Sequence, residues 1–373
     1  MCGEIMAERV RQLITRSGRS QGEFATLAGL DPSKMSKSLS GTRRFTSLDL
    51  ARIAELGGVT VDWLLGADET PALAGRLPSP PGSSVESAAQ EADRLTQLRA
   101  DLAFLGYKQH VTLPQTTPVG SWWVGQGQQL AAWALDEACA AGADPSHTRD
   151  LAELIEHVFG IDVAISELPD GFDGLASSRE HRRLIVVGTS TVPSRQRFTL
   201  AHELGHVLAG DDQGLLVEAD IYDKRHSRQS SEIRANAFAT AFLLPEELLK
   251  SETSGMAWTD ESFAKLAFRW WVSPSALAWR LHNVSLISKD LCDRFRGMTT
   301  ESAALLAGEL GSFTEWIDAA SRCRIPQLLL RDTFQAYLDG TSTLRPFSNL
   351  IGEDSESIRQ ALEQAGEEPP LTS

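Results

Sequence analysis

Apolar residues recur at helical spacing along most of this chain of 373 residues, whereas strand-like runs are few. Residues 161–165 and 183–187 are short and rich in Val and Ile, and they predict two strands joined through the glycine-containing segment 171–174. Helical patterns cover residues 95–105, 128–141 and 148–159, and the chain after Pro245 has a helical pattern that includes residues 263–281, 328–338 and 355–365. The predicted fold class is α+β, predominantly helical, with a small sheet.

A change in composition marks a domain boundary. The segment from Asp68 to Gln90 is rich in Pro, Gly, Ser and Ala, and three prolines lie close together at 78, 80 and 81. We therefore expect a flexible linker over residues 69–92. A chain of this length suits two or three domains. The linker would separate a helical domain at 1–68 from a second domain at 93–290, which a helical C-terminal region at 291–373 follows.

Cysteine usage and hydropathy limit the class of protein. The four cysteines, at positions 2, 139, 292 and 323, have no Cys-x-x-Cys spacing, which argues against a disulfide framework and against a structural zinc ribbon. The sequence has no signal-peptide pattern and no apolar run long enough to span a bilayer. We therefore expect a soluble, cytoplasmic protein with no membrane partner. Trp122 and Trp123 are expected to be packing residues.

The segment Arg-Phe-Thr-Leu-Ala-His-Glu-Leu-Gly-His at 197–206 carries candidate chemistry. His202 and His206 are four residues apart, so on a helix both imidazoles lie on one face and can reach one metal ion. Leucines at 200, 204 and 208 form an apolar stripe on the opposite face, which predicts a half-buried helix that aims the histidines at a cleft. Glu203 lies beside the ligand face, where it could polarise a water molecule at the metal. The alternative is a chance His-x-x-x-His on a solvated helix.

A catalytic zinc usually takes three protein ligands and leaves its fourth position to water. The best third ligand is Glu232, on a second predicted helix that Ser230 or Ser231 can cap and Pro245 limits. Asn236 follows one turn later on the same face, where its side chain could orient a ligand.

The loop from Gly210 to Gln229 leaves other ligands open. Four side chains in this loop could serve as the third metal ligand in place of Glu232: Glu218, Asp220, Asp223 and His226. His226 or Tyr222 could instead stabilise a tetrahedral intermediate, although a surface position is the simpler expectation for both.

The run 197–206, followed by Glu-Ile-Arg-Ala-Asn-Ala-Phe-Ala-Thr-Ala-Phe-Leu-Leu-Pro at 232–245, resembles the ImmA/IrrE family of metallopeptidases. That family combines a zincin helix with Glu-x-x-Ala-Asn-x-Phe-Ala, an apolar pair and a proline. The resemblance covers roughly residues 125–290. It implies that His202, His206 and Glu232 bind zinc and that Glu203 is the general base of a zinc metalloendopeptidase. Family members typically cleave, or promote the loss of, helix-turn-helix repressors.

Zincin-type peptidases commonly have a small sheet directly before the zinc helix. An edge strand of such a sheet can hold the substrate backbone by main-chain hydrogen bonds. We expect the strand at residues 183–187 to have this role.

The first 68 residues carry a second pattern. Gly29 can supply the turn between two short helices. Asp31 is a natural N-cap and Pro32 suits the first helical position, so a helix should begin there and stop at Gly41. Over its whole length this segment resembles the XRE (Cro/repressor-type) helix-turn-helix domain.

Charge favours nucleic acid as the partner of this segment. Residues 9–52 contain nine Lys or Arg against three Asp or Glu, a net charge of +6, whereas the whole chain carries −15. Phosphate contacts need local positive charge, although a helical interaction module with a solvated basic face is the alternative. In the usual docking of this motif, the major groove would be approached by Ser33, Lys34 and Lys37. The DNA backbone would be approached by Gln21, Arg43 and Arg44. XRE domains commonly bind palindromes as dimers, so operator DNA and a second copy of the chain are the expected partners.

Two functions fit these patterns. In the first, a DNA-binding zinc endopeptidase cleaves a helix-turn-helix repressor, or itself within the linker, to derepress genes. In the second, a transcriptional regulator uses a peptidase-like domain to sense a ligand or a metal without proteolysis, an arrangement that resembles regulators of short-chain fatty-acid metabolism. The intact motif favours the first function, because a sensor has no need of the general base Glu203.

Overall fold

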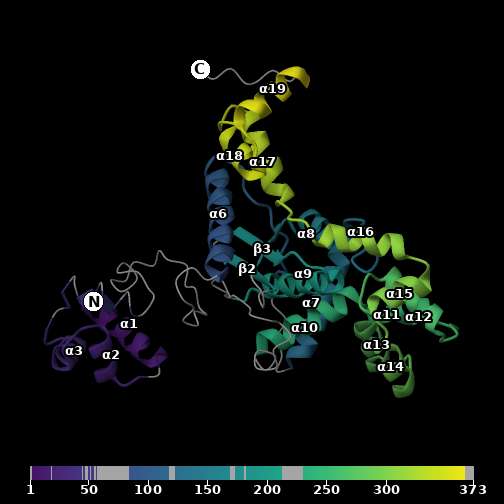
Figure 1. Ribbon diagram of the computed structural model, residues 1–373, viewed down its shortest axis with the longest axis horizontal. Coiled ribbons are helices and arrows are strands. Elements are labelled where there is room, and N and C mark those ends of the chain that lie inside the picture. Colours follow the sequence, from purple (N-terminus) through teal and green to yellow (C-terminus); the bar gives the residue numbers. More distant parts are fainter. Residues whose placement is uncertain are drawn as a thin grey trace. The chain divides into compact units, whose positions relative to one another are not determined.

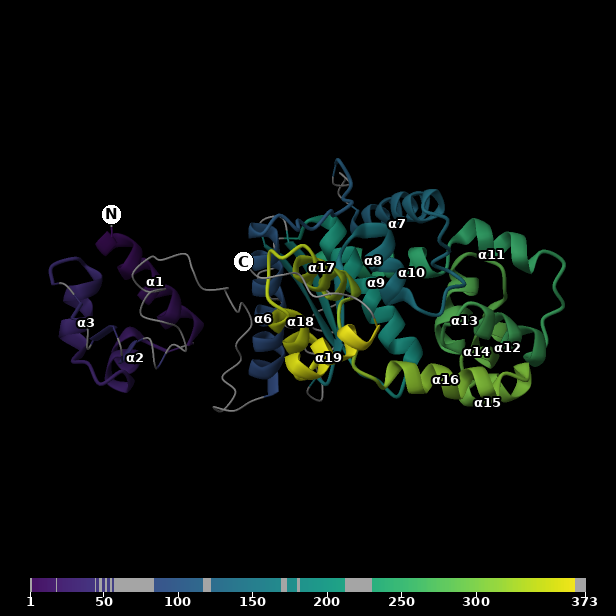
Figure 2. The same cartoon turned by 90° about the horizontal axis from the view of Figure 1, so that it is seen from above.

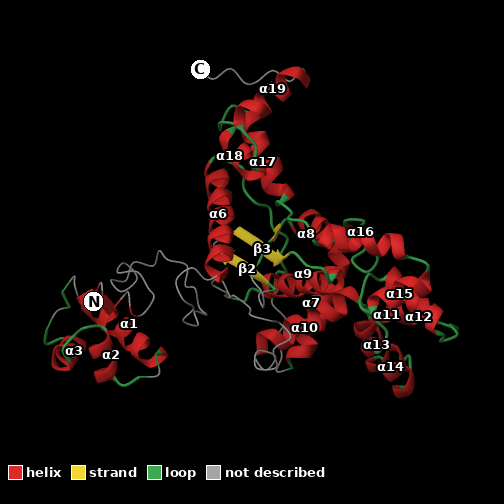
Figure 3. Cartoon of the chain, viewed as in Figure 1, coloured by secondary structure: helices red, strands yellow, loops and turns green. Residues whose placement is uncertain are grey.

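The computed structural model describes residues 2–17, 19–43, 45–46, 49–50, 52–53, 56, 84–116, 122–168, 173–179, 182–211 and 230–365. The chain divides into two compact units, Met1–Pro80 and Pro81–Ser373. Helices dominate the described residues, and they surround one small sheet in the second unit (Figures 1 and 3). The predicted α+β, predominantly helical fold class is confirmed.

The first unit contains α1 (Cys2–Arg16), α2 (Gln21–Leu27) and α3 (Pro32–Leu39). The predicted start of α3 is confirmed, because the Asp31 side chain accepts hydrogen bonds from the backbone amides of Ser33 and Lys34. Gly29 and Gly41 have positive φ angles of 67° and 78°, as the turn and the helix stop require. Apolar side chains from all three helices form a common core. Residues 57–68, expected to complete this domain, lie outside the described residues.

The sheet of the second unit has the strand order β1-β3-β2 in the described part of the chain, with β1 at Asp162–Ser166, β2 at Gly174–Arg179 and β3 at Arg182–Gly188. Strand β3 pairs with β1 in parallel and with β2 antiparallel. Two sequence expectations were therefore wrong. Residues 183–187 lie in the central strand and not at an edge, and the stretch between the two predicted strands, which was expected to be a connection, contains the edge strand β2 from Gly174 onward.

Side chains of the sheet alternate between two packed layers, as the period of two in a strand requires. Residues 163, 165, 176, 185 and 187 belong to one core, which contains α7 (Trp123–Ala140), α8 (Leu151–Phe159), α9 (Pro193–Ala209) and α10 (Ser230–Leu243). Residues 164, 175, 184 and 186 belong to another core, which contains α6 (Ser84–Phe104), α17 (Gln327–Leu338) and α18 (Arg345–Ile351). Figures 1 and 2 show the sheet between these two groups of helices. We call them the α9 face and the α6 face.

Helices fill the chain after Pro245, as predicted. Besides α17 and α18, they are α11 (Glu246–Thr253), α12 (Asp260–Arg269), α13 (Pro274–Asn283), α14 (Lys289–Phe295), α15 (Thr300–Ala307), α16 (Leu310–Ala320) and α19 (Ser355–Ala365). The C-terminal region is not a separate unit, because α17 packs on β1 and α6. Helix α6 begins at Ser84, so residues 84–92 are helical where the sequence suggested a linker. No described helix combines the length and the apolar character that crossing a membrane needs.

Candidate metal centre

Helix α9 carries His202, Glu203 and His206 and is buried on every side from Arg197 to Ala209 apart from the half-buried Phe198. Its predicted leucine stripe does lie in the core. The expected half-buried helix was nevertheless wrong, because α7, α8, α10 and the sheet all pack against α9. The exposed fractions of His202, Glu203, His206 and Glu232 are 0, 1, 1 and 4%. All four side chains are therefore buried in the described structure.

Two glycines allow α10 to lie close to its neighbours. A Cβ atom on Gly205 of α9 would lie 2.9 Å from Cδ1 of Phe238 on α10. A Cβ atom on Gly127 of α7 would lie 2.3 Å from the carbonyl oxygen of Arg234, a contact that no real side chain tolerates. Hydrogen at these positions lets α10 approach both helices and brings Glu232, in its first turn, to the histidines of α9.

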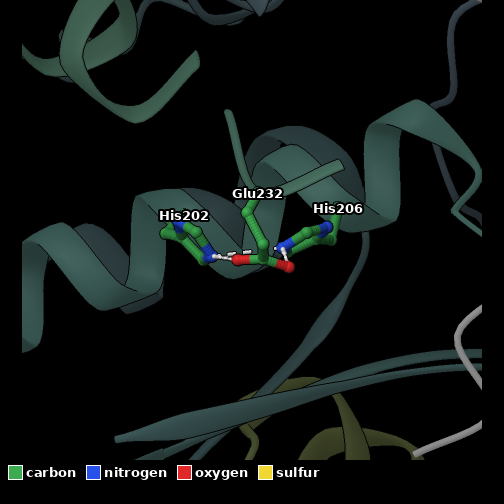
Figure 4. A group of neighbouring side chains, drawn as sticks. All are labelled: His202, His206 and Glu232. Atoms are coloured by element: carbon green, nitrogen blue, oxygen red, sulfur yellow. Dashed lines mark hydrogen bonds and ion pairs between the residues drawn. The ribbon is translucent and has the colours of Figure 1, made fainter. Parts of the chain in front are cut away.

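The three predicted metal ligands come together. Nε2 of His202 lies 3.1 Å from Nε2 of His206, and the carboxylate oxygens of Glu232 lie 3.3 Å from the first nitrogen and 3.4 Å from the second. Figure 4 shows the Glu232 carboxylate between the two imidazoles. Within the described residues, these three are a group of side chains whose ligand atoms converge closely enough to hold one metal ion.

The distances fit a tetrahedral ion. Bonds of about 2.0–2.2 Å from zinc to nitrogen or oxygen place neighbouring ligand atoms about 3.3 Å apart. Hydrogen bonding also fits, because Nδ1 of His202 lies 3.2 Å from the Asn236 side-chain oxygen and Nδ1 of His206 lies 2.8 Å from a carboxylate oxygen of Asp211. Both oxygens are acceptors, so each imidazole donates from Nδ1 and, when neutral, directs the lone pair of Nε2 toward Glu232.

Charged side chains surround the two histidines. Among the described residues, the buried carboxylates of Glu203 and Glu232 and the half-buried carboxylate of Asp211 lie around the histidines, and the guanidinium of Arg234 pairs with Asp211. The carboxylate of Glu232 gives the two imidazoles a negatively charged oxygen ligand, as a divalent cation requires. Burial disfavours the charged form of Asp211, but hydrogen bonds from His206 and Arg234 lower its pKa below the ordinary value.

Sequence reasoning found Asn236 and missed Asp211. Asn236 contacts His202 from one turn after Glu232, as expected. Asp211 directly follows Gly210, which ends α9 in the left-handed conformation with φ 67°. The sequence feature that could have indicated this contact is a carboxylate just beyond the helix end, five residues after a histidine ligand. The Asp211 side chain reaches back to His206 only because the chain turns at Gly210, whereas the sequence indicated only that a loop starts there.

Glu203 lies near the start of the edge strand. A Cβ atom on Gly174, the first residue of β2, would lie 3.3 Å from Oε1 of Glu203 and 2.9 Å from a methyl group of Thr199. The absence of a side chain at Gly174 therefore lets the backbone of β2 approach the proposed general base.

A buried arginine fixes the first part of α9. Arg197 donates hydrogen bonds to the carbonyl oxygens of Pro145, Ser146 and Thr148, in the loop between α7 and α8. Burial lowers the pKa of Arg197 to about 9, so its side chain is still charged at neutral pH. These contacts attach the metal helix to the neighbouring loop before the first ligand.

The other predicted positions have different surroundings. Side chains of Ser33, Lys34 and Lys37 are exposed on α3, and Gln21 is exposed at the start of α2. Arg43 has partners within the first unit, Asp49 at 2.8 Å and the hydroxyl of Ser38 at 3.0 Å. The positions outside the described residues are Arg44, Glu218, Asp220, Tyr222, Asp223 and His226.

The two tryptophans at the start of α7 are not core residues. Trp122 is 67% exposed and Trp123 is 38% exposed, so the expectation that both serve in packing was wrong. The Trp123 ring instead lies 5.8 Å from the guanidinium carbon of Arg234, in a cation–π contact.

Comparisons with known proteins agree with this geometry for part of the chain. The chain is 36% identical over 134 residues to the radiation response metalloprotease IrrE of Deinococcus radiodurans, a match that covers 36% of this chain and 40% of that protein. It is 34% identical over 134 residues to the protein of the same name from Deinococcus deserti, covering 36% of this chain and 47% of the relative. The chain therefore spans less than half the length of these two relatives. No helix-turn-helix domain was detected. Residues 157–282, which contain His202, Glu203, His206 and Glu232, match the peptidase family described as the IrrE N-terminal-like domain.

Proposed function

We propose that this protein is a DNA-binding, zinc-dependent endopeptidase that cleaves a helix-turn-helix transcriptional repressor, or its own linker, and so derepresses genes. The observation that carries the proposal is the buried group of two imidazoles and a carboxylate at tetrahedral spacing. The similarity of residues 157–282 to a peptidase family supports the same reaction class. The choice of a repressor as substrate rests on the sequence resemblance to ImmA/IrrE peptidases.

Each buried side chain has a role in this proposal. His202, His206 and Glu232 hold the ion, and zinc suits two nitrogens and one oxygen with one position left open. When bound, zinc supplies a Lewis acid for the peptide carbonyl and acidifies a water molecule. Glu203 accepts the proton of the attacking water on its carboxylate and delivers it to the leaving amine.

The substrate backbone pairs with β2 in this proposal. Strand β2 is an edge of the sheet, and its first residue, Gly174, lies close to Glu203. An extended peptide added to such an edge gains main-chain hydrogen bonds without any demand on its side chains.

DNA binding is assigned to the first unit. The exposed side chains of Ser33, Lys34 and Lys37 on the capped helix α3 could reach base edges or phosphates. The internal ion pair of Arg43 with Asp49 makes that arginine a positioning element as well as a candidate phosphate contact. Replacing both lysines with glutamine should weaken operator binding and reduce its dependence on salt concentration, because each lysine that contacts a phosphate releases counterions.

Burial of the site favours a second candidate function. A regulator that senses a metal needs ligands but no path for a peptide, and the exposed fraction of the four residues does not exceed 4%. In this alternative, zinc binding changes DNA affinity and no peptide bond is cleaved. Glu203 has no clear role in such a sensor.

The experiment that separates the two functions replaces Glu203 with Gln. Purified chain is incubated with zinc and either the repressor encoded beside its gene or no other protein, and cleavage, zinc content and operator affinity are measured. We expect Glu203→Gln to lower the cleavage rate by at least about 100-fold while zinc content and DNA affinity stay unchanged. Glu247→Gln is the matched control, because the Glu247 side chain is 88% exposed on α11. Cleavage that persists in the Glu203 variant contradicts the mechanism, and zinc-dependent DNA affinity without cleavage by the wild type supports the sensor.

A further inference from the structure

The two histidines of α9 are supported by different groups. The His202 imidazole contacts the neutral side chain of Asn236, with 3.2 Å between Nδ1 and Oδ1. The His206 imidazole contacts a carboxylate, with 2.8 Å between Nδ1 and Oδ2 of Asp211. A carboxylate is the stronger acceptor and raises the basicity of the imidazole that donates to it. His206 therefore donates to a charged acceptor, whereas the Asn236 acceptor of His202 is neutral.

The Asp211 carboxylate is held in place from two directions. The backbone amide of Asp211 donates to the carbonyl oxygen of His206 at 3.2 Å, which returns the chain to the end of α9. Its Oδ1 atom pairs with Arg234 of α10, while Oδ2 accepts from His206. The side chains of Asp211 and Arg234 are each 13% exposed, so the ion pair is poorly screened by solvent.

Arg234 is itself fixed by α7. Its guanidinium donates to the side-chain oxygen of Gln126 at 3.3 Å, and it lies over the Trp123 ring. Gly127, the next residue of α7, gives the close approach to the backbone of Arg234 described above. Gln126 of α7 and Arg234 of α10 thus fix the position of Oδ1 of Asp211. The other oxygen, Oδ2, accepts from Nδ1 of His206 and so fixes the orientation of that ring.

We propose that Asp211 is a positioning residue of the metal site and that Arg234 acts through it. In this proposal, which rests on the metal site of the proposed function, Asp211 keeps the proton of His206 on Nδ1 and the lone pair of Nε2 directed at the ion. Arg234 occupies the other carboxylate oxygen, so that Asp211 stays at His206 and does not turn toward the cation. Two residues outside the His-Glu-x-x-His motif thereby set the metal affinity.

The test measures zinc affinity by competition with a chelator in the full chain. Asp211→Asn keeps the shape of the side chain and removes its charge, and we expect it to weaken zinc binding by about 10–100-fold. Arg234→Gln should weaken binding by a smaller factor. Because Arg234 acts through Asp211, the double variant should bind zinc no more weakly than Asp211→Asn alone, whereas two independent effects would multiply.

A second readout excludes a merely structural role. Cobalt(II) replaces zinc, and its visible absorption reports ligand geometry, which should change in Asp211→Asn but stay as in the wild type in the control Asp332→Asn. Asp332 belongs to a buried ion pair on the α6 face, so its variant tests whether loss of any buried charge has the same effect. Circular dichroism confirms the folded fraction used in each titration.

The outcomes separate the two levels of the proposal. A wild-type chain that binds no zinc contradicts the proposed function itself. A wild-type chain that binds zinc while Asp211→Asn binds it equally tightly, with an unchanged cobalt spectrum, overturns the role of Asp211. If Asp211→Asn does not fold, Arg234→Gln decides, since unchanged zinc affinity and cobalt spectrum in that variant also contradict the proposal.

Discussion

The two faces of the small sheet both bury polar and charged side chains, but they group these side chains differently. On the α6 face, the Arg99 guanidinium donates to both carboxylate oxygens of Asp162 at 2.8 and 2.6 Å and to Asp332 at 2.6 Å. Arg99 and Asp162 are each only 2% exposed. On the α9 face, two imidazoles and a carboxylate converge at distances that suit one metal ion.

The difference separates a structural cluster from a ligand site. A buried charge is costly unless it is paired and hydrogen-bonded. The Arg99 cluster contains its own cation, so it is complete within the chain. In the group of His202, His206 and Glu232, the contacts with Asn236 and Asp211 keep the proton of each neutral imidazole on Nδ1. The Nε2 lone pairs and the Glu232 carboxylate are then all electron-pair donors, so a cation from solution completes the group. Burial alone is therefore a poor sign of a functional site, whereas buried nitrogen and oxygen ligands that converge at metal-binding distances are a good one.

Breaking the complete cluster should have the largest effect on stability. Arg99→Met leaves the buried carboxylate of Asp162 without its cation and leaves Asp332 paired with Arg331 alone, and we expect it to lower the free energy of unfolding of the second unit by about 3–5 kcal/mol. Urea denaturation followed by circular dichroism measures the change. Zinc stoichiometry should stay at the wild-type value in the folded variant. Loss of zinc with little loss of stability would show that the two faces are not independent.

Adding zinc should stabilise the α9 face alone. A ligand that binds only the folded state raises the free energy of unfolding by about 2.7 kcal/mol when its free concentration is about 100 times Kd. We expect this increase in the wild type and in Asp332→Asn, and its reversal when a chelator removes the metal. In Glu232→Gln the third ligand has no negative charge, so zinc should raise the free energy of unfolding of this variant much less. Equal stabilisation of wild type and Glu232→Gln by zinc would argue against this site.

A smaller effect should follow from separating α7 and α10. In Gly127→Ala the new methyl group meets the backbone oxygen of Arg234, which cannot move without shifting a helix. We expect a loss of about 1–3 kcal/mol in the free energy of unfolding, together with weaker zinc binding. Gly311→Ala is the matched control, because Gly311 lies in α16 with no atom near the added Cβ. That control should gain up to about 1 kcal/mol from helix propensity.

The smallest expected effect concerns acid. Burial opposes ionisation of Asp144, but hydrogen bonds from the His147 ring and from the backbone amides of Ser146 and His147 lower its pKa below the ordinary 3.8. The folded state thus holds this proton less tightly than the unfolded state. The stability that Asp144 contributes is present above about pH 4 and is lost as the pH falls through the lowered pKa.

Denaturation of wild type and Asp144→Asn at a series of pH values measures this contribution. The part of this difference that depends on the ionised Asp144 carboxylate should be lost only below about pH 4. A difference that already disappears near neutral pH would show that another group controls the loop between α7 and α8.

Sequence reasoning succeeded where local patterns decide the structure. Helix α19 begins and ends where its apolar period predicts, and α3 begins at the predicted cap. Glu232, the third ligand that the sequence favoured, contacts both histidines, and each ligand lies on one side of its own helix as the helix period predicts.

Tertiary contacts decide what the sequence did not predict. Strand β2, Gly-Leu-Ala-Ser-Ser-Arg, has no β-branched residue and gains its place by pairing with β3. The full burial of α9 depends on close approach by neighbouring helices at Gly205, which a periodic pattern on one helix cannot reveal. Asp211 reaches His206 through a turn, so its role follows from chain geometry and not from a motif.

The central claim is that His202, His206 and Glu232 together hold one divalent cation. Equilibrium dialysis against zinc, with metal analysis of the dialysed chain, tests it most directly in the wild type, in His206→Ala and in Glu232→Gln, with Asp332→Asn as the control. We expect one zinc ion per chain in the wild type and the control, and strongly reduced binding in the other two. A wild type that takes up no zinc, or substituted chains that bind it as tightly as the wild type, would contradict the account.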